Sequence, residues 1–263
     1  MAVHVQAELV GKEQLKPDIY RFTIESKEIA KDAMPGHFLE IKVSDLTEPL
    51  LRRPISIYHV DKENDMIAFI FQVKGKGTEI LAQKQVGDTI DTLGPLGYGT
   101  FEIKENAKVA ILGGGIGVFP LYELAKRLRE KNTQVDIYLG FRGEKQVVLE
   151  DEFSKIGNEL ILATDDGSYG KNGFAIQFLA ERIKEYDMIY SCGPLPMLKA
   201  LQKLAAENSI PCQISLEERM GCGIGACLGC AVKVISGKEP RYGHVCKEMC
   251  IRDSKKAIKS IQV

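Results

Sequence analysis

The sequence predicts a chain of three parts: a six-stranded antiparallel barrel, then an α/β domain with a parallel sheet, then a small cysteine-rich segment. Three observations support this prediction. Residues 1–103 contain six short runs with strand character, and turn residues separate most of them. From residue 104 strands alternate with helix-length segments, and from residue 217 glycine and cysteine become frequent. We therefore place the domain boundaries at 1–103, 104–216 and 217–263.

The barrel is predicted from alternating apolar and polar residues in the first part. Tyr20, Phe22 and Ile24 alternate with polar neighbours, as expected for a strand with one face in a core. Because little helix lies between the runs, the strands should pair as antiparallel neighbours. The expected strands are residues 3–10, 20–24, 39–43, 55–60, 66–73 and 89–93, with one short helix at 78–85.

The second part is predicted to be a parallel sheet with helices on both faces. An apolar run at 109–112 is followed by glycines and then by Leu121, Leu124 and Leu128, which share one face of a helix. Strands that alternate with helices in this way form a parallel sheet. Further strands are expected at 135–139, 160–163, 188–191 and 212–216, with helices at 174–184 and 195–208.

Composition argues against several functional classes. The 35 Lys and Arg residues against 36 Asp and Glu give a formal net charge of −1, so neither a nucleic-acid nor a membrane surface is indicated. The longest nearly uncharged stretch, residues 109–122, is shorter than the ~20 residues of a membrane-spanning helix. No basic region followed by an apolar core is visible at the start, so we expect no secretory signal and a cytoplasmic protein.

The seven cysteines all lie at or after Cys192, and this clustering indicates a metal site rather than a disulfide scaffold. Cys222, Cys227 and Cys230 have the C-x4-C-x2-C spacing of plant-type [2Fe–2S] loops, and Cys246 follows further along. The glycines among them let backbone N–H groups approach the cluster and stabilise its negative charge. We therefore expect a [2Fe–2S] cluster held by these four cysteines.

Alternatives exist for the metal and for its fourth ligand. Structural zinc usually takes pairs of ligands from separate knuckles, whereas three of these cysteines share one loop. Cys250 competes with Cys246, which we favour because it follows a strand-like pair of residues after a Gly-Lys-Glu-Pro turn. Cys192 and Cys212 are expected to be small buried apolar side chains.

Two elements of the barrel are suited to the phosphates of a dinucleotide. Arg53, Pro54, Ile55 and Ser56 open a strand, where an arginine can pair with a diphosphate and a serine can hydrogen-bond a ring system. Gly77-Thr78 opens the short helix, whose free N–H groups and positive dipole end attract an anion. The alternatives are a solvated strand edge and a capped turn. Together the two elements favour a dinucleotide in the barrel.

A second nucleotide site is predicted where the first parallel strand meets its helix. A Rossmann-like fold binds pyrophosphate there. The strict G-x-G-x-x-G pattern fails at Val118, and Arg142 follows the second strand where an acidic residue is expected. The pattern therefore fits a reductase-type nicotinamide domain better than a dehydrogenase, although the glycines could serve tight packing only. The glycines are Gly113, Gly114, Gly115 and Gly117.

Cys192, Gly193 and Pro194 end the fourth parallel strand at the same edge of the sheet. Ligands of open α/β sheets lie at this carboxyl edge, so we expect the three residues to contact the nicotinamide cofactor. The alternative is a strand-to-helix turn that contains a buried thiol.

In this order the motifs resemble those of the ferredoxin–NADP reductase superfamily. Residues 53–56 resemble its flavin motif, Gly77-Thr78 its flavin-phosphate turn, and Cys192-Gly193-Pro194 its nicotinamide-side motif. The run from Glu217 to Cys227 (EERMGCGIGAC) is similar to the electron-transfer subunits of class B dihydroorotate dehydrogenases. The resemblance covers nearly the whole chain, from the barrel to Cys246.

This resemblance implies an electron relay. FAD would bind in the barrel, where Ile70, Phe71 and Gln72 would also line the flavin, and NAD(H) would bind the second domain as a substrate. A partner subunit carrying FMN would oxidise dihydroorotate to orotate in pyrimidine biosynthesis, within a heterotetramer of two plus two subunits. Electrons would pass from FMN through [2Fe–2S] to FAD and then as hydride to NAD. No acid–base residue is required, in agreement with four histidines that form no triad pattern.

Residues 249–263 depart from the family, in which an acidic residue and a Gly-Pro-Val-Phe-like run usually follow the last cysteine. We assign no function to this tail. Two other functions stay open on the residues: a stand-alone NAD(P)H:acceptor reductase with flavin and iron–sulfur groups, and a non-enzymatic scaffold stabilised by zinc. The preference between NADH and NADPH is also open, because an arginine such as Arg142 can favour a 2′-phosphate.

Overall fold

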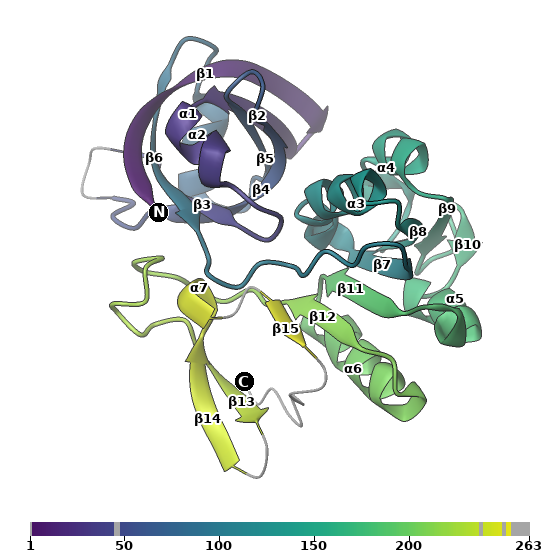
Figure 1. Cartoon of the computed structure of the whole chain (residues 1–263). Coiled ribbons are helices and arrows are strands. Elements are labelled where there is room, and N and C mark those ends of the chain that lie inside the picture. The colour runs from purple at the N-terminus through teal and green to yellow at the C-terminus, as the bar shows by residue number, and fades with distance from the viewer. Residues whose placement is uncertain (1, 45–47, 237–238, 249–250, 254–263) are drawn as a thin grey trace.

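The computed structural model describes residues 2–44, 48–236, 239–248 and 251–253. It confirms the predicted architecture (Figure 1): a closed antiparallel barrel, a mostly parallel sheet with helices on both faces, and a small C-terminal segment. Cys250 and most of the tail at 249–263 lie outside the described residues. Among the described residues, no helix is long and apolar enough to cross a membrane.

The barrel closes in the strand order β1-β2-β5-β4-β3-β6, with antiparallel neighbours throughout. Its first strand is longer than predicted, because irregularities near Gly11 and Gln14 bend the strand without ending it. Apolar side chains such as Phe22, Leu39 and Phe69 fill the interior. The strands are β1 Val3–Lys16, β2 Ile19–Glu25, β3 Phe38–Lys42, β4 Arg53–Asp61, β5 Met66–Gln72 and β6 Thr89–Leu96.

Two helices accompany the barrel. The predicted helix is α2, Lys76–Gln83, which begins two residues earlier than expected. The other, α1 at Lys27–Asp32, was not predicted, because it is one and a half turns long and shows little apolar periodicity. Its cap is nevertheless visible in the sequence, since Ser26 Oγ accepts a hydrogen bond from the Ile29 N–H at 3.3 Å.

The second sheet has the strand order β10-β9-β8-β7-β11-β12-β15 and is parallel except for β15, which pairs antiparallel to β12. The order reverses beside β7, since the chain first builds through β8, β9 and β10 and then returns to add β11 on the other side. Ligands of open α/β sheets bind at such a switch point. The strands are β7 Lys108–Gly114, β8 Gln134–Phe141, β9 Glu159–Thr164, β10 Lys171–Asn172, β11 Met188–Cys192, β12 Cys212–Ser215 and β15 Ile251–Asp253.

Helices cover both faces of this sheet, as predicted (Figure 1). Two of them, α3 Leu121–Glu130 and α4 Glu150–Ile156, pack together on the face toward the barrel. The other two, α5 Ala175–Arg182 and α6 Leu195–Asn208, pack together on the opposite face. Short 3₁₀ turns occur at Gly115–Val118, Glu144–Gln146 and Ile183–Glu185.

Contacts between α3 and β4 join the barrel to the α/β domain. Tyr58 stacks on Tyr122 with ring centroids 4.5 Å apart, and the buried carboxylate of Glu123 lies 2.7 Å from His59 Nδ1. The same carboxylate accepts a hydrogen bond from the Val60 N–H at 3.2 Å. This interface turns one side of the barrel toward the switch point of the sheet.

The C-terminal segment consists of a loop from residue 217, the hairpin of β13 Ala231–Ser236 and β14 Glu239–His244, and the one-turn helix α7 Val245–Glu248. It contacts the barrel at Gly223, where a Cβ atom would lie 2.6 Å from Glu40 Cγ. A two-stranded hairpin is only marginally stable by itself. The segment therefore depends on contacts with the rest of the chain and on whatever its cysteines bind.

Candidate flavin, nucleotide and cluster sites

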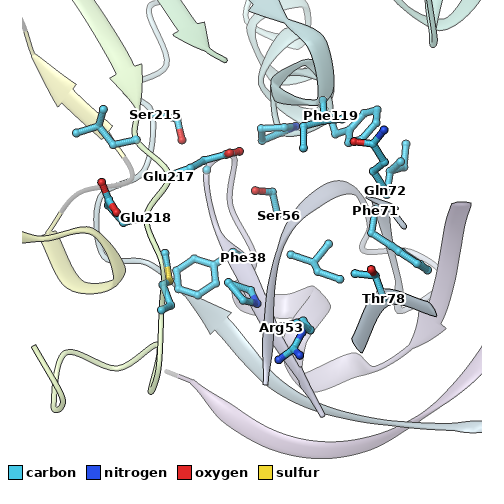
Figure 2. A pocket seen from close by; sticks show the side chains of 18 residues that line it. Phe38, Arg53, Ser56, Phe71, Gln72, Thr78, Phe119, Ser215, Glu217 and Glu218 are labelled. Carbon is cyan, nitrogen blue, oxygen red and sulfur yellow. The ribbon is translucent and has the colours of Figure 1, made fainter. Parts of the chain in front are cut away.

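A cavity of ≈ 250 Å³ lies where the barrel meets the α/β domain (Figure 2). Its walls come from the barrel, from the turn before α3, and from residues 215–220, which we call the connector because they lead from β12 to the cysteine loop. The structure brings together eight of the residues that the sequence predicted for FAD: Arg53, Pro54, Ile55, Ser56, Ile70, Phe71, Gln72 and Thr78.

Arg53 and Gly77 lie in contact at the start of α2. A Cβ atom built on Gly77 would be 2.3 Å from Arg53 Nε, so only glycine leaves room for the guanidinium there. Arg53 also donates to the Leu51 carbonyl at 2.6 Å, and Thr78 Oγ accepts from the Lys74 N–H at 2.9 Å. The first bond orients the Arg53 guanidinium, and the second closes the turn that leads into α2. The arginine thus lies beside the first N–H groups of the helix, an arrangement that can hold a diphosphate.

We expect Gly77→Ala to lower the affinity for FAD about tenfold or more, the scale of one charge-assisted hydrogen bond of ~1.5–3 kcal/mol. The added methyl group would push the Arg53 guanidinium away from α2, while the fold is retained because that side chain is flexible. A flavin fluorescence titration of the apoprotein measures the effect. Gly75→Ala is the matched control, since nothing lies within 4 Å of its built Cβ. Equal affinities for FAD in the two variants would contradict the role of Gly77.

A second cavity, of ≈ 600 Å³, adjoins the first at the switch point of the sheet. The glycine turn after β7, the Gly193-Pro194 turn after β11 and Arg142 after β8 line it. Five residues line both cavities, so the two spaces share a wall: Gln72, Ile116, Leu216, Glu217 and Glu218. A nicotinamide in the second cavity could therefore reach a ring in the first, as hydride transfer requires.

Of the seven residues predicted for the nucleotide site, five line the second cavity and two do not. Gly114, Gly115, Gly117, Gly193 and Pro194 line the second cavity.

Gly113 and Cys192 lie deeper in the sheet and do not line either cavity. A Cβ atom on Gly113 would be 2.9 Å from Val118 Cγ1 and 3.2 Å from Leu121 Cδ1, so this glycine allows the strand to pack closely on α3 and on the 3₁₀ turn before it. Cys192 is fully buried, and Cys212 at the start of the adjacent strand β12 is also buried. The predicted contact of Gly113 and Cys192 with a cofactor stays a prediction.

Gly117 and Gly193 bring the two turns of the switch point together. A Cβ atom on Gly117 would lie 2.6 Å from both the Cα and the N atom of Gly193. Because these are backbone atoms, no side-chain movement can relieve the conflict. The glycine turn therefore combines a ligand-lining role with close packing, the two readings that its sequence left open.

Glu217 lines both cavities and was not predicted as a site residue. Figure 2 shows its side chain and that of Ser56 pointing into the same space. The Glu217 side chain is open to the cavity, but protein encloses its carboxyl group on the other sides. This burial raises the pKa of Glu217, and the positive charge of Lys74 opposes the shift. A sequence signal existed, since a charged residue directly follows an apolar strand at the carboxyl edge of the sheet.

The four predicted cluster cysteines lie as two neighbouring pairs. Cys230 Sγ and Cys246 Sγ are 3.2 Å apart and buried. Cys222 Sγ accepts a hydrogen bond from the Cys227 N–H at 3.3 Å, and both residues are more exposed. Among the described residues, no three His, Cys, Asp or Glu side chains are arranged around a single metal ion. Two thiol pairs, by contrast, suit a cluster in which each of two irons takes two cysteines.

Backbone N–H groups surround these sulfurs. Burial would raise the pKa of Cys222, but hydrogen bonds from the backbone of Cys227, Ile224 and Ala226 outweigh it and lower that pKa to about 6. Burial raises the pKa of Cys246 to about 12, and the Cys230 thiol adds to this effect. N–H groups that converge on sulfur stabilise negative charge, so the loop fits an anionic iron–sulfur cluster.

Glu40 of β3 lies beneath this loop and was also missed by the sequence prediction. It is fully buried, and both carboxyl oxygens lack a hydrogen-bond partner. Burial raises its pKa to about 7, while Arg52 and Arg53 oppose the shift and Cys222 adds to it. An acidic residue inside an apolar strand gives no sign in the sequence of which element will cover it.

Comparisons with known proteins agree with this geometry. Three family models match the chain: an oxidoreductase FAD-binding domain at residues 6–102, an oxidoreductase NAD-binding domain at 111–203, and the iron–sulfur cluster binding domain of dihydroorotate dehydrogenase B at 217–248. The electron transfer subunit of dihydroorotate dehydrogenase B (NAD(+)) from Lysinibacillus sphaericus is 43% identical over 91% of this chain and 93% of its own length.

The chain belongs to this family of electron transfer subunits. The corresponding subunit from Geobacillus kaustophilus is 44% identical over 87% of this chain and 88% of its own. Among solved structures, a chain of an NADH-dependent reduced ferredoxin–NADP oxidoreductase is 31% identical, with a TM-score of 0.84 over 96% of this subunit and 89% of that chain. The predicted family, fold and cofactor set of the subunit (FAD, [2Fe–2S] and NAD) are therefore confirmed.

Proposed function

We propose that this subunit receives electrons singly at a [2Fe–2S] cluster and delivers them through FAD to NAD⁺, for a partner subunit that oxidises dihydroorotate to orotate on FMN. The observation that carries the proposal is the path of the connector. Five residues of the connector line the flavin cavity, three of them (Leu216, Glu217 and Glu218) line the nucleotide cavity as well, and the cluster loop begins at Cys222. One short segment thus contacts all three sites.

Each part of the chain would hold one group. Residues 1–103 would bind FAD, residues 104–216 would bind NAD, and residues 217–263 would carry the cluster. Cys222, Cys227, Cys230 and Cys246 would be its ligands, since their two pairs and the surrounding N–H groups suit an anionic cluster of two irons. When bound, FAD exchanges electron pairs with NAD and single electrons with the cluster.

The polypeptide itself would bind, orient and shield these groups. Arg53 beside Gly77 would hold the diphosphate of FAD, and the glycine turn after β7 would receive that of NAD. Glu217 would keep a proton on its carboxyl group to higher pH than an exposed glutamate, because burial raises its pKa. This carboxyl faces the wall shared by both cavities, where a hydride and a proton would be exchanged.

The partner would dock over the cluster loop. Ile224 is 51% exposed and Leu228 is 58% exposed, and they flank the exposed Cys227. Large apolar side chains exposed beside a redox group indicate a surface that another protein covers. We propose that the FMN subunit covers it, in a cytoplasmic heterotetramer of two plus two subunits. The thiols of the described cysteines, which form no disulfides, are in keeping with a reducing compartment.

Reconstitution tests this function. The subunit is purified anaerobically, alone and together with the products of neighbouring genes, and its iron, acid-labile sulfide and FAD are measured. We expect NADH to reduce the flavin of the isolated subunit, and dihydroorotate to reduce NAD⁺ only after the FMN subunit is added. Reduction of a separate acceptor without any FMN subunit would favour the stand-alone reductase. A colourless protein that contains zinc would favour the scaffold.

The docking surface gives a further prediction. Leu228→Asp should weaken assembly with the FMN subunit by roughly 10–100-fold, because a charge would be buried in the interface. Leu228 has a φ of 60°, a conformation that aspartate tolerates. Val86→Asp is the matched control, because Val86 is also 58% exposed. It lies shortly before the first residue of β6, whereas the end of β6 that approaches the flavin cavity is at Leu96, which pairs with Phe38. Equal dissociation constants for the two variants in analytical ultracentrifugation would contradict the docking site.

A further inference from the structure

The connector joins the flavin cavity to the cluster loop with very little chain between them. Its last cavity-lining residue is Met220, and Cys222 follows two positions later. Two Cα–Cα steps of ~3.8 Å place the Cα atoms of these residues at most about 7.6 Å apart. The cavity wall at Met220 is therefore also the start of the cluster loop. The connector residues that line the cavity are Ser215, Leu216, Glu217, Glu218 and Met220.

Strand β3 makes the same connection from the barrel. Phe38 lines the flavin cavity and is 4% exposed, and Figure 2 shows it on the side of the cavity next to the connector. Glu40 lies two residues further on the same face of the strand and touches the loop at Gly223. Met220 and Phe38 are thus two apolar side chains on the border between the flavin cavity and the cluster loop.

We infer that Met220 is a positioning residue for electron exchange between the flavin and the cluster, an inference that rests on the proposed function. Its unbranched, polarizable thioether can fill an irregular gap between a ring in the cavity and the loop that carries Cys222. A void in its place would remove the packed atoms through which the two groups couple. Met220 does not line the nucleotide cavity, so hydride transfer from NADH should depend on it much less than cluster reduction does.

The two electron-transfer steps can be measured separately. In the first step a hydride, which carries two electrons and one proton, passes from NADH to the flavin, and solvent supplies a second proton. In the second step one electron passes from the reduced flavin to the oxidised cluster, whose charge becomes more negative by one unit, and no bond to a heavy atom breaks. Met220 should affect mainly the second step.

The test compares Met220→Ala with the volume-conserving variant Met220→Leu in the full chain loaded with FAD and cluster. Anaerobic stopped-flow absorbance follows flavin bleaching by NADH, and freeze-quench EPR follows cluster reduction. We expect cluster reduction to be about tenfold slower in Met220→Ala, because the packed atoms between the two groups are lost, and flavin bleaching to change far less in both variants. Met220→Leu should stay close to wild type.

Two further measurements exclude a merely structural effect. Because Met220 lines the flavin cavity, the affinity of the apoprotein for FAD is measured by fluorescence titration and both steps are compared at saturating FAD. The EPR line shape of the dithionite-reduced cluster should be unchanged in Met220→Ala. Met220→Val leaves a smaller void and should be intermediate in the second step, so it provides the test if the alanine variant does not fold. Cluster reduction at the wild-type rate, or equal slowing of both steps, would overturn the inference while leaving the relay intact. Absence of iron from the wild-type protein would instead overturn the proposed function.

Discussion

Cys246→Ser is expected to abolish the iron–sulfur cluster and all dihydroorotate-dependent reduction of NAD⁺, while FAD binding and flavin reduction by NADH persist. Cys246 is the second residue of α7, and its thiol lies buried 3.2 Å from that of Cys230. A serine there removes one of four thiolates, and the remaining three cannot complete both irons. The FAD and nucleotide cavities contain none of the four cysteines in their walls, so their functions should remain.

Cys250→Ser is the matched control, because Cys250 is the rival fourth ligand from the sequence. It lies outside the described residues, whereas the Cys246 thiol lies beside that of Cys230 and close enough to Cys222 to interact with it electrostatically. Iron and acid-labile sulfide per chain should be at wild-type levels in Cys250→Ser and near zero in Cys246→Ser. The reverse pattern of iron contents would transfer the fourth ligand to Cys250.

Loss of the cluster should also loosen the segment that holds it. Among the described residues, β13 and β14 pair with each other alone. The residues of this segment that join an apolar cluster are Met220, Cys230, Val232, Val245 and Cys246. Segments of this size depend on a bound metal group for much of their stability. Limited proteolysis of Cys246→Ser should therefore cut within residues 217–248 and leave the barrel and the α/β domain intact.

Sequence patterns predicted the architecture where a period repeats along the chain. The alternation in β2 and the helical spacing in α3 each report one buried face, and these elements formed where expected. Boundaries were less accurate, because they depend on local geometry. Irregular pairing near Gly11 extends β1 to Lys16, and the short α1 is marked only by its Ser26 cap. Two-residue β10 has too few residues to show any period.

The sites were predictable only to the extent that a motif carries its chemistry in one stretch of chain. The cysteine spacing and the Arg-Pro-Ile-Ser segment do so, and the structure places these residues in one loop region and one cavity. Walls contributed by distant elements were not predictable. Phe38, Phe119 and Met220 come from three parts of the chain and meet only after folding. Glu40 likewise becomes part of the cluster region only because the cysteine loop packs over it at Gly223.

Gly117→Ala is expected to lower the affinity for NADH roughly 100-fold and to destabilise the α/β domain by about 1–3 kcal/mol. The new methyl group would meet backbone atoms of Gly193 at 2.6 Å, so the turn after β7 and the turn after β11 must separate. Both turns line the nucleotide cavity, and their separation changes its shape where the pyrophosphate is expected. The barrel has no part in this contact, so FAD should still bind, although Ile116 beside Gly117 also lines the flavin cavity and a smaller loss of affinity for FAD is expected.

Gly115→Ala is the control that distinguishes the clash between the two turns from the general cost of replacing a glycine in this loop. Gly115 has a φ of +55°, which costs a side chain about 1–2 kcal/mol, but nothing lies within 4 Å of its built Cβ. Thermal unfolding should therefore show that the Gly115→Ala variant is destabilised about as much as Gly117→Ala. Its two turns should stay in contact, so it should bind NADH more tightly than Gly117→Ala does. Flavin bleaching at increasing NADH concentrations measures the difference, with dithionite reduction as the reference for intact flavin. If both variants bind NADH equally well, the contact between Gly117 and Gly193 serves only the stability of the sheet, and the shape of the cavity must be set by other residues.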